Sequence, residues 1–333
     1  MRLRFWPAWG VLFIGFLSAN ALSSADFEPV QLQQIQQILK VPDSLALVTD
    51  AYWPDPQKPP DYFLVQDVHR EPSVQSQIAT LIEKGYKQWG VKKIFMEGAY
   101  TGVDLSVFHR VPTKTQSYLL EQLVKDGHLS GAELAAIHIM EREWGDPPVS
   151  PFQLFGLENP KLYQENVMAF QSVVAQRDRA LEALVPIRRL QETIHLPQPN
   201  AMMEQLDRTE ALLRLKLTST EYKAYLKGKA MVPSTPILDP AIRAAETFYQ
   251  LAEERSQVFL DNAAKKVPAS AAPRLLVVGG FHTAYMTAHL RDAGRTFVVL
   301  SPAVSASAED DPYEKNLMET ANAMTEALST TTH

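Results

Sequence analysis

The sequence contains no cysteine among its 333 residues. Disulfide bonds, thiolate metal sites and cysteine nucleophiles are therefore excluded, and a metal ion would need histidine, carboxylate or tyrosine ligands. The net charge is −6, and no block rich in lysine and arginine occurs anywhere in the chain. Because nucleic-acid-binding proteins usually carry a basic face, we expect no nucleic-acid partner.

Several sequence motifs of known chemistry are absent as well. The chain has no G-x-S-x-G nucleophile elbow, no G-x-x-x-x-G-K-[ST] phosphate loop, no H-E-x-x-H zinc motif and no G-x-G-x-x-G dinucleotide motif. It also lacks the C-x-x-C-H motif of covalent haem attachment. Any chemistry must therefore come from residues that the fold assembles.

No apolar run in the chain is long enough for a comfortable membrane span. The first residues are a short basic segment at 1–4, an apolar segment at 5–17 and an A-x-A cleavage site within 18–21. This order predicts a secretory signal peptide over residues 1–25, with an uncleaved anchor as the alternative. We therefore expect an exported protein, periplasmic or extracellular, without a stable membrane span once the signal is removed.

The remaining chain has the composition of a globular protein, with 46% hydrophobic and 21% charged residues. Short apolar runs typical of strands alternate with stretches at helical spacing, and the first such unit reads as strand, helix and parallel strand. We predict an α/β fold, a central and mostly parallel sheet flanked by helices, formed by residues 26–165 and 268–328. The predicted strands lie at 45–48, 62–69, 92–97, 152–158, 275–278 and 296–300. The predicted helices lie at 26–40, from residue 72 onward, within 103–144 with breaks near Pro112 and Gly127, at 283–292 and at 313–327.

A long stretch in the middle of the chain differs in kind. From residue 161 to 267 there is no strand-like run, and leucine, alanine, glutamine, glutamate and arginine are frequent. We expect three or four long helices here and treat residues 166–267 as an all-helical insertion. Such an insertion would wall or cover the site of the α/β domain and select its substrate.

Acidic residues and histidines follow four of the predicted strands where each strand ends. They are Asp67, His69, Glu97, Glu158 and His282. Open α/β sheets bind their ligands outside the carboxyl ends of the strands, so we expect these side chains to meet at the mouth of one cleft. The pair Gly279–Gly280 before His282 adds backbone freedom at this turn.

Two kinds of chemistry suit this set of residues. His69, Glu97, Glu158 and His282 could hold a divalent metal ion. Alternatively, Asp67, His69, Glu97 and His282 could act as acids and bases around a bound water. Structural roles compete for two members, since Asp67 could cap the following helix and Glu158 could start the helix after Pro160.

Other polar residues are secondary candidates for the same site. Gln75 lies in the first turns of the helix after His69, and Tyr163 and Asn166 follow Glu158. Core or capping roles are as favoured for them. The histidines at 109, 128, 138 and 195 have no matching partners in the sequence, and His289 shares a helix face with His282.

Three short motifs together resemble one family. The segments V-Q-D-V-H at 65–69, F-M-E at 95–97 and V-G-G-F-H at 278–282 are similar to the strand-end motifs of the Tiki/TraB and ChaN/erythromycin-esterase-like superfamily. Gly279 and His282 match its late G-x-x-H motif, whereas Asp67 stands where the ChaN-like branch has glutamate and Gln66 departs from the usual glycine. Glu158 is added from its place at a strand end and not from the family.

The resemblance implies the α/β fold and a set of activities that differ between branches, namely metal-dependent proteolysis, ester hydrolysis and haem binding. We therefore expect an exported hydrolase acting on a small-molecule or peptide substrate, with a divalent metal ion as its expected cofactor or with none. The alternative is a protein that binds haem or another small ligand in the same cleft. A third hypothesis is a degenerate relative that acts through its helical insertion.

Overall fold

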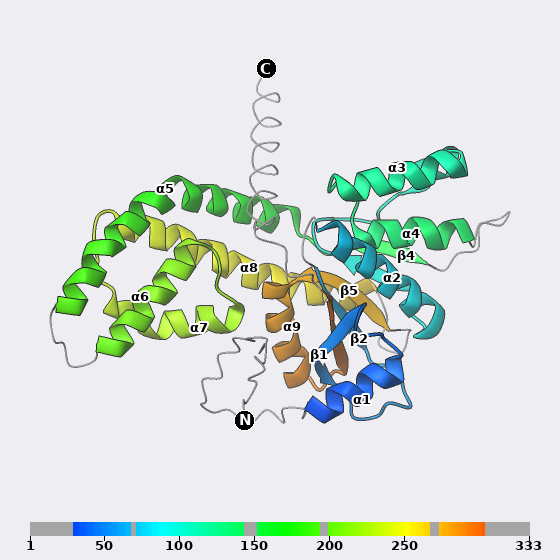
Figure 1. The fold of residues 1–333 in the computed structure, drawn as a ribbon, viewed down its shortest axis with the longest axis horizontal. Helices are drawn as coiled ribbons and strands as arrows, with labels where there is room; N and C mark the ends of the chain where they lie inside the picture. Colours follow the sequence, from blue (N-terminus) through cyan, green and yellow to red (C-terminus); the bar gives the residue numbers. More distant parts are fainter. Residues whose placement is uncertain (1–28, 68–70, 143–151, 194–198, 267–272, 304–333) are drawn as a thin grey trace, which may run out of the picture.

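The structure, a computed structural model, describes residues 29–67, 71–142, 152–193, 199–266 and 273–303. The predicted signal peptide and the predicted last helix lie outside these residues. The described chain forms a six-stranded sheet with strand order β1-β6-β2-β5-β3-β4 and helices on both faces (Figure 1). β1 is antiparallel to β6, and all other neighbouring strands are parallel. The predicted α/β fold with a mostly parallel sheet is confirmed.

The strands are short and their central members are buried on both faces, as expected for parallel strands covered by helices. Every residue of β5 from Arg274 to Val278 is buried, and so are the first four residues of β2. Their sequences, Y-F-L-V and L-L-V-V, are accordingly continuous apolar runs. The strand bounds are Ala46–Tyr52 (β1), Tyr62–Asp67 (β2), Lys93–Met96 (β3), Gln153–Gly156 (β4), Arg274–Gly279 (β5) and Phe297–Pro302 (β6).

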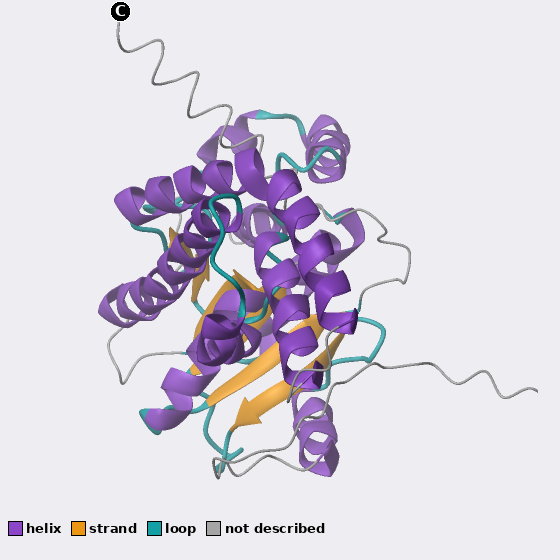
Figure 2. Cartoon of the chain, turned by 90° about the vertical axis from the view of Figure 1, so that its left-hand side faces the viewer, coloured by secondary structure: helices purple, strands orange, loops and turns teal. Residues whose placement is uncertain are grey.

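Two hydrophobic cores lie on opposite faces of the sheet. Alternate residues of one strand point to opposite faces, so Phe63 and Val65 join one core and Leu64 joins the other. The first core is completed by α1 (Pro29–Leu39), α2 (Pro72–Gln88) and α4 (Gly131–Arg142), and the second by α8 (Leu238–Lys266) and α9 (Gly280–Asp292). The turned view in Figure 2 shows the strands enclosed between helices. Between β3 and α4 lie the short 3₁₀ helix η1 (Ser106–Arg110) and α3 (Thr113–Lys125), and α3 also contributes to the first core.

The described part of the stretch from 161 to 267 contains helices only, as predicted. They are α5 (Pro160–Thr193), α6 (Pro199–Leu213), α7 (Ser219–Gly228), the 3₁₀ helix η2 (Lys229–Met231) and α8. Their own cores include Phe170, Tyr225 and Tyr249. α8 belongs to both parts, because Ala245 and Tyr249 pack among these helices whereas Phe259 packs on the sheet.

Both outer edges of the sheet have hydrogen-bond partners. At β1, the side-chain amide of Gln36 donates to the carbonyl of Ala46 at 3.1 Å and accepts from the backbone N–H of Val48 at 2.9 Å. At β4, the backbone N–H of Val103 donates to Leu154 at 3.1 Å, and Gly102 forms an antiparallel bridge to Phe155. A side chain at one edge and a loop at the other therefore take the place of further strands.

Some element bounds differ from those predicted. The edge strand β1 reaches Tyr52 and runs antiparallel, a direction that its short apolar run does not encode. β2 ends at Asp67, and residues 68–70 lie outside the described chain. α9 begins at Gly280 and not at residue 283, because Gly279 already has the extended conformation of an N-cap, with φ −62° and ψ 160°. The breaks expected near Pro112 and Gly127 are confirmed by the ends of α3.

Candidate functional site

The parallel register brings three strand ends together. Asp67, the last residue of β2, lies directly opposite Gly279, the last residue of β5. Glu97 follows β3, and its backbone N–H donates to the carbonyl of Val277 at 3.1 Å. The Glu97 carboxylate then accepts through Oε2 from the backbone N–H of Gly279 at 2.9 Å. The prediction that Asp67 and Glu97 lie at the carboxyl ends of parallel strands of one sheet is thus confirmed.

His282 contacts Glu97 directly. Its Nε2 lies 3.3 Å from Glu97 Oε1, a contact that is favourable when Nε2 carries a proton. The other ring nitrogen, Nδ1, lies 2.8 Å from the Ser256 hydroxyl, which also lies 2.8 Å from the carbonyl of Ala252. Each ring nitrogen of His282 therefore has a protein partner, and the orientation of the imidazole is fixed.

His282 is buried, with 4% of its surface exposed, so its expected place at an open cleft mouth is wrong. The helix begins directly after the strand and carries His282 in its first turn, where Phe259 and Phe281 lie against the ring at 4.9 and 5.8 Å between centroids. Gly279 and Gly280 are not among the glycines with positive φ. The double glycine therefore does not supply a left-handed turn here.

Arg255 of α8 is the central cation of the cluster, and it was not predicted. Its Nη2 donates to Glu158 Oε1 at 2.6 Å and to Glu97 Oε1 at 3.0 Å, and its Nε donates to Glu158 Oε2 at 3.2 Å. Arg255 is 2% exposed. A guanidinium buried to this degree requires compensating carboxylates, and the two strand ends supply them.

Glu158 is part of this charged cluster and does not start a helix. Its side chain is fully buried, and besides Arg255 it accepts from the backbone N–H of Gly98 at 3.3 Å. The capping role belongs to Asn159, whose side-chain oxygen accepts from the N–H groups of Lys161 and Leu162 at 3.0 and 3.2 Å. The competing structural role of Glu158 is therefore excluded.

Two residues of α5 complete the surroundings of Arg255, as their position after Glu158 allowed. Asn166 accepts from Arg255 Nη1 at 2.9 Å and donates to the carbonyl of Phe248 at 2.9 Å. The ring of Tyr163 lies 5.3 Å from the guanidinium carbon, within the range of a cation–π contact, and packs edge-on against Tyr100. Burial raises the pKa of Tyr100, and the negative charge of Glu158 adds to this rise while Arg255 opposes it.

Asp67 is partly exposed, and its side chain lies on the face of the sheet that α2 covers, opposite to the face of Arg255 and His282. Its Oδ1 accepts from Gln75 Nε2 at 2.7 Å, and Gln75 Oε1 accepts in turn from the backbone N–H of Gly131 at 2.7 Å. The N-cap of α2 is Glu71, so Asp67 does not cap that helix. Gln75 thus holds the Asp67 carboxylate toward α2, whereas His69 lies outside the described residues.

Two glycines allow the loop after Glu97 to pass close to β4. Gly98 has φ +82°, a conformation that only glycine adopts without strain. A Cβ on Gly156 would lie 2.0 Å from the backbone carbon and oxygen of Ala99, which is a clash. This close passage brings the backbone N–H of Gly98 to Glu158.

The predicted metal ligands do not fit a metal ion in this arrangement. Both carboxylates, Glu97 and Glu158, are bonded to Arg255, and His282 has no ring nitrogen without a partner. Within the described residues, no group of three or more histidines and carboxylates is placed to hold a metal. Haem ligation through His282 would meet the same obstacle. A divalent metal ion and haem both stay predictions. Binding of either would require a rearranged site or His69 as a ligand.

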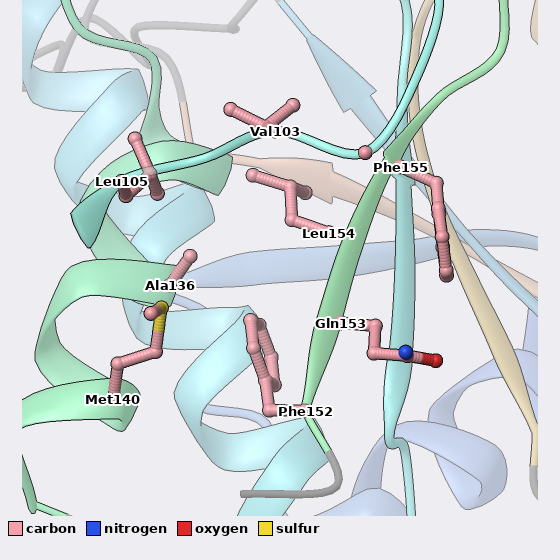
Figure 3. A pocket seen from close by; sticks show the side chains of 9 residues that line it. Val103, Leu105, Ala136, Met140, Phe152, Gln153, Leu154 and Phe155 are labelled. Carbon is pink, nitrogen blue, oxygen red and sulfur yellow. The ribbon is translucent and has the colours of Figure 1, made fainter. Parts of the chain in front are cut away.

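Two hollows lie away from these charged groups. One, of about 230 Å³, adjoins β4 (Figure 3), where Phe152 and Leu154 face Val103, Leu105 and Ala136. None of its lining residues is an acid or a base. The other, of about 650 Å³, lies between α2, α3 and α4 and includes His138, which is paired with Glu83 at 2.9 Å. Neither hollow contains a residue predicted for the site.

Arg255 and Ser256 could have been found from the pattern of α8. The buried face of this helix includes Ala252, Phe259 and Ala263, and Arg255 and Ser256 fall on the same face. A charged residue on an apolar helix face is costly unless it is paired. That misplaced charge was the signal for a partner elsewhere in the chain.

Comparisons with protein-family models, curated proteins and solved structures found no match. The resemblance to the Tiki/TraB and ChaN/erythromycin-esterase-like superfamily therefore stays a prediction based on its motifs. Along the described chain, no helix combines the length and apolarity needed to cross a membrane.

Proposed function

We propose that this protein is an exported hydrolase of ester or peptide bonds that acts at the carboxyl ends of β2, β3 and β5. The observation that carries the proposal is the contact of His282 Nε2 with Glu97 Oε1 at the carboxyl end of the sheet, where β2 also ends at Asp67. A histidine paired with a carboxylate is a common basis for acid–base catalysis. Glu97 and His282, far apart in the sequence, meet where β3 and β5 end.

The residues divide into two groups by exposure. Asp67, partly exposed at the end of β2, would accept a proton from the attacking water, with His69 two positions further along the chain as its expected partner. The Glu97–His282 pair would supply a proton to the leaving group. Glu97 is the more exposed member of this pair, with 10% of its side chain accessible against 5% for His282.

Several contacts favour a reaction that depends on fixed orientation. The Gly279 N–H holds one oxygen of Glu97, and Ser256 holds the imidazole of His282 from behind. Ser256 is fully buried and donates to a backbone carbonyl in its own helix, so we assign it an orienting role and not that of a nucleophile. Groups held in this way lose little entropy when the substrate binds.

The test is a screen of the purified protein against chromogenic esters and fluorogenic peptides, with and without a chelator. We expect Asp67→Asn, Glu97→Gln and His282→Gln each to lower kcat/KM by about 100-fold or more, the usual effect of removing an acid or base. His289→Gln is the matched control, since His289 lies in the same helix and bonds only within it in the described contacts. Equal activity of wild type and all three variants would refute the assignment.

A ligand-binding protein is the competing function, and haemin is its specific probe. A Soret band that appears on adding haemin and disappears in His69→Ala would favour it. The double partnering of His282 argues against that residue as the axial ligand.

A further inference from the structure

We propose that the guanidinium of Arg255 occupies the place of a divalent cation between the strand-end carboxylates, so that this site works without a metal ion. The proposal rests on the proposed function for its final clause only. The occupancy itself concerns Arg255, Glu97 and Glu158 and can be measured without a substrate.

The carboxylates converge on one atom, as ligands do around a cation. Glu158 Oε1 lies 2.6 Å and Glu97 Oε1 lies 3.0 Å from Arg255 Nη2. Calcium–oxygen distances in proteins are about 2.3–2.6 Å, so a cation at the position of Nη2 would require shifts of only a few tenths of an ångström. The imidazole of His282 contacts the same oxygen of Glu97 at 3.3 Å. Without Arg255, the two carboxylate oxygens would face a common point.

The guanidinium is a permanent part of this site and not an exchangeable ion. Its Nη1 is bonded to Asn166 and its carbon lies 5.3 and 5.5 Å from the ring centres of Tyr163 and Phe259. Asn166 is in turn anchored to the carbonyl of Phe248 on α8. A free cation could enter only by displacing the Arg255 side chain, which is held by hydrogen bonds along the guanidinium and by contacts with two aromatic rings.

Burial makes the cation necessary. Glu158 has no exposed side-chain surface, and Glu97 has 10%. Carboxylates at such depth need a positive partner, and in many enzymes a metal ion serves this purpose. Here the positive charge is supplied by a helix from the stretch that the sequence marks as an insertion. Arg255 is therefore a positioning residue, which acts by holding Glu97 against His282.

The first test compares the melting temperature of the full chain in chelator and in millimolar Ca²⁺, Mn²⁺ or Zn²⁺. Wild type and Arg255→Lys, which both keep an internal cation, should show no shift with metal. Arg255→Ala should melt lower in chelator and regain roughly 5 °C at a metal concentration 100 times its dissociation constant. Titration calorimetry should find about one metal ion per chain in Arg255→Ala and none in wild type.

The matched control removes the carboxylates together with the cation. The triple variant Arg255→Ala, Glu97→Gln, Glu158→Gln has the same cavity but no charge, and it should not respond to metal. If Arg255→Ala fails to fold in chelator, refolding with and without Ca²⁺ gives the same comparison, and recovery only with metal supports the proposal. Failure of Arg255→Ala to respond to any of the three metals would overturn it, and so would wild-type binding of one ion that stabilises the chain as strongly.

A second readout separates this proposal from the hydrolase assignment. If hydrolysis is detected, wild-type kcat should be unchanged by chelator, and free guanidinium should restore part of the kcat that Arg255→Ala loses, with little effect on KM. Loss of wild-type activity in chelator would overturn the metal-free clause. The melting and calorimetric results need no substrate, so they decide the occupancy even where the hydrolase assignment fails.

Discussion

Replacing either carboxylate that Arg255 binds by its neutral amide should destabilise the protein, but to different degrees. Glu158 receives two hydrogen bonds from Arg255 and one from the N–H of Gly98, and its side chain is fully buried. Glu97 receives one bond from Arg255 and is partly exposed. Glu158→Gln would set an amide NH₂ against the guanidinium, so that two buried donors face each other. Glu97→Gln leaves the two-bond pair intact.

The magnitudes follow from what each variant leaves unpaired. Breaking a buried ion pair costs about 3–5 kcal/mol, and since Arg255 keeps Glu97 we take the lower end, about 3 kcal/mol, for Glu158→Gln. For Glu97→Gln we expect about 1.5 kcal/mol, the scale of one hydrogen bond to a charged group. At roughly 2–4 °C per kcal/mol, the melting temperatures should fall by about 6–12 °C and about 3–6 °C respectively.

The assay is urea unfolding followed by far-UV circular dichroism, with melting curves alongside. The control is Glu165→Gln, because Glu165 is an exposed carboxylate 3.8 Å from Lys161 and should change the free energy of unfolding by less than about 0.5 kcal/mol. A loss for Glu158→Gln that is no larger than that for Glu97→Gln would refute the reasoning. It would mean that the charge of Glu158 is not the principal counter-ion of Arg255.

Three further predictions concern other parts of the chain. Burial raises the pKa of Tyr222 to about 12 and raises that of Tyr225 further. Between pH 10 and about 12 the unfolded chain therefore loses protons that the folded chain keeps, and the free energy of unfolding falls as the pH rises. The urea midpoint should fall less steeply with pH in the double variant Tyr222→Phe, Tyr225→Phe than in wild type. Gly156→Ala should lower stability by about 1–3 kcal/mol or more, because its Cβ would clash with the backbone of Ala99, and an unchanged melting temperature would contradict this close approach. Ser256→Ala should lower kcat about tenfold with KM unchanged if the hydroxyl orients the imidazole of His282. A loss of activity that only matches the loss of folded protein would instead indicate a packing role for Ser256.

The strand ends could be predicted from the sequence because their information is local. An apolar run followed by a polar residue marks where a strand leaves the core, and parallel strands share one carboxyl end, so Glu97 and Asp67 were correctly placed at that end. The meeting of His282 with Glu97 follows from the same rule. Its burial does not, because that depends on where α9 begins and on the packing of Phe259 from a distant helix.

The pattern of α8 marks Arg255 as a buried charge, but it does not say which residues Arg255 pairs with. Arg255 is separated along the chain from both of its carboxylate partners, and its helix contains many charged residues that lie on the solvent side. Only the period of the buried face distinguishes it from those residues. Without that signal, carboxylates and histidines at strand ends predict a metal ion. In the structure the cation between the carboxylates is the guanidinium of Arg255.

The amide of Gln36 against β1 and the bridge of Gly102 to β4 have a consequence for assembly. A sheet whose outermost strands have some of their outward backbone groups already paired offers a poorer template on which a second molecule could add its own strand. Crowded or partly denaturing conditions should thus not readily convert the folded protein into fibrillar stacks, and association between copies would have to use helix surfaces. Replacement of Gln36 would leave the backbone groups of Ala46 and Val48 at the β1 edge without this partner.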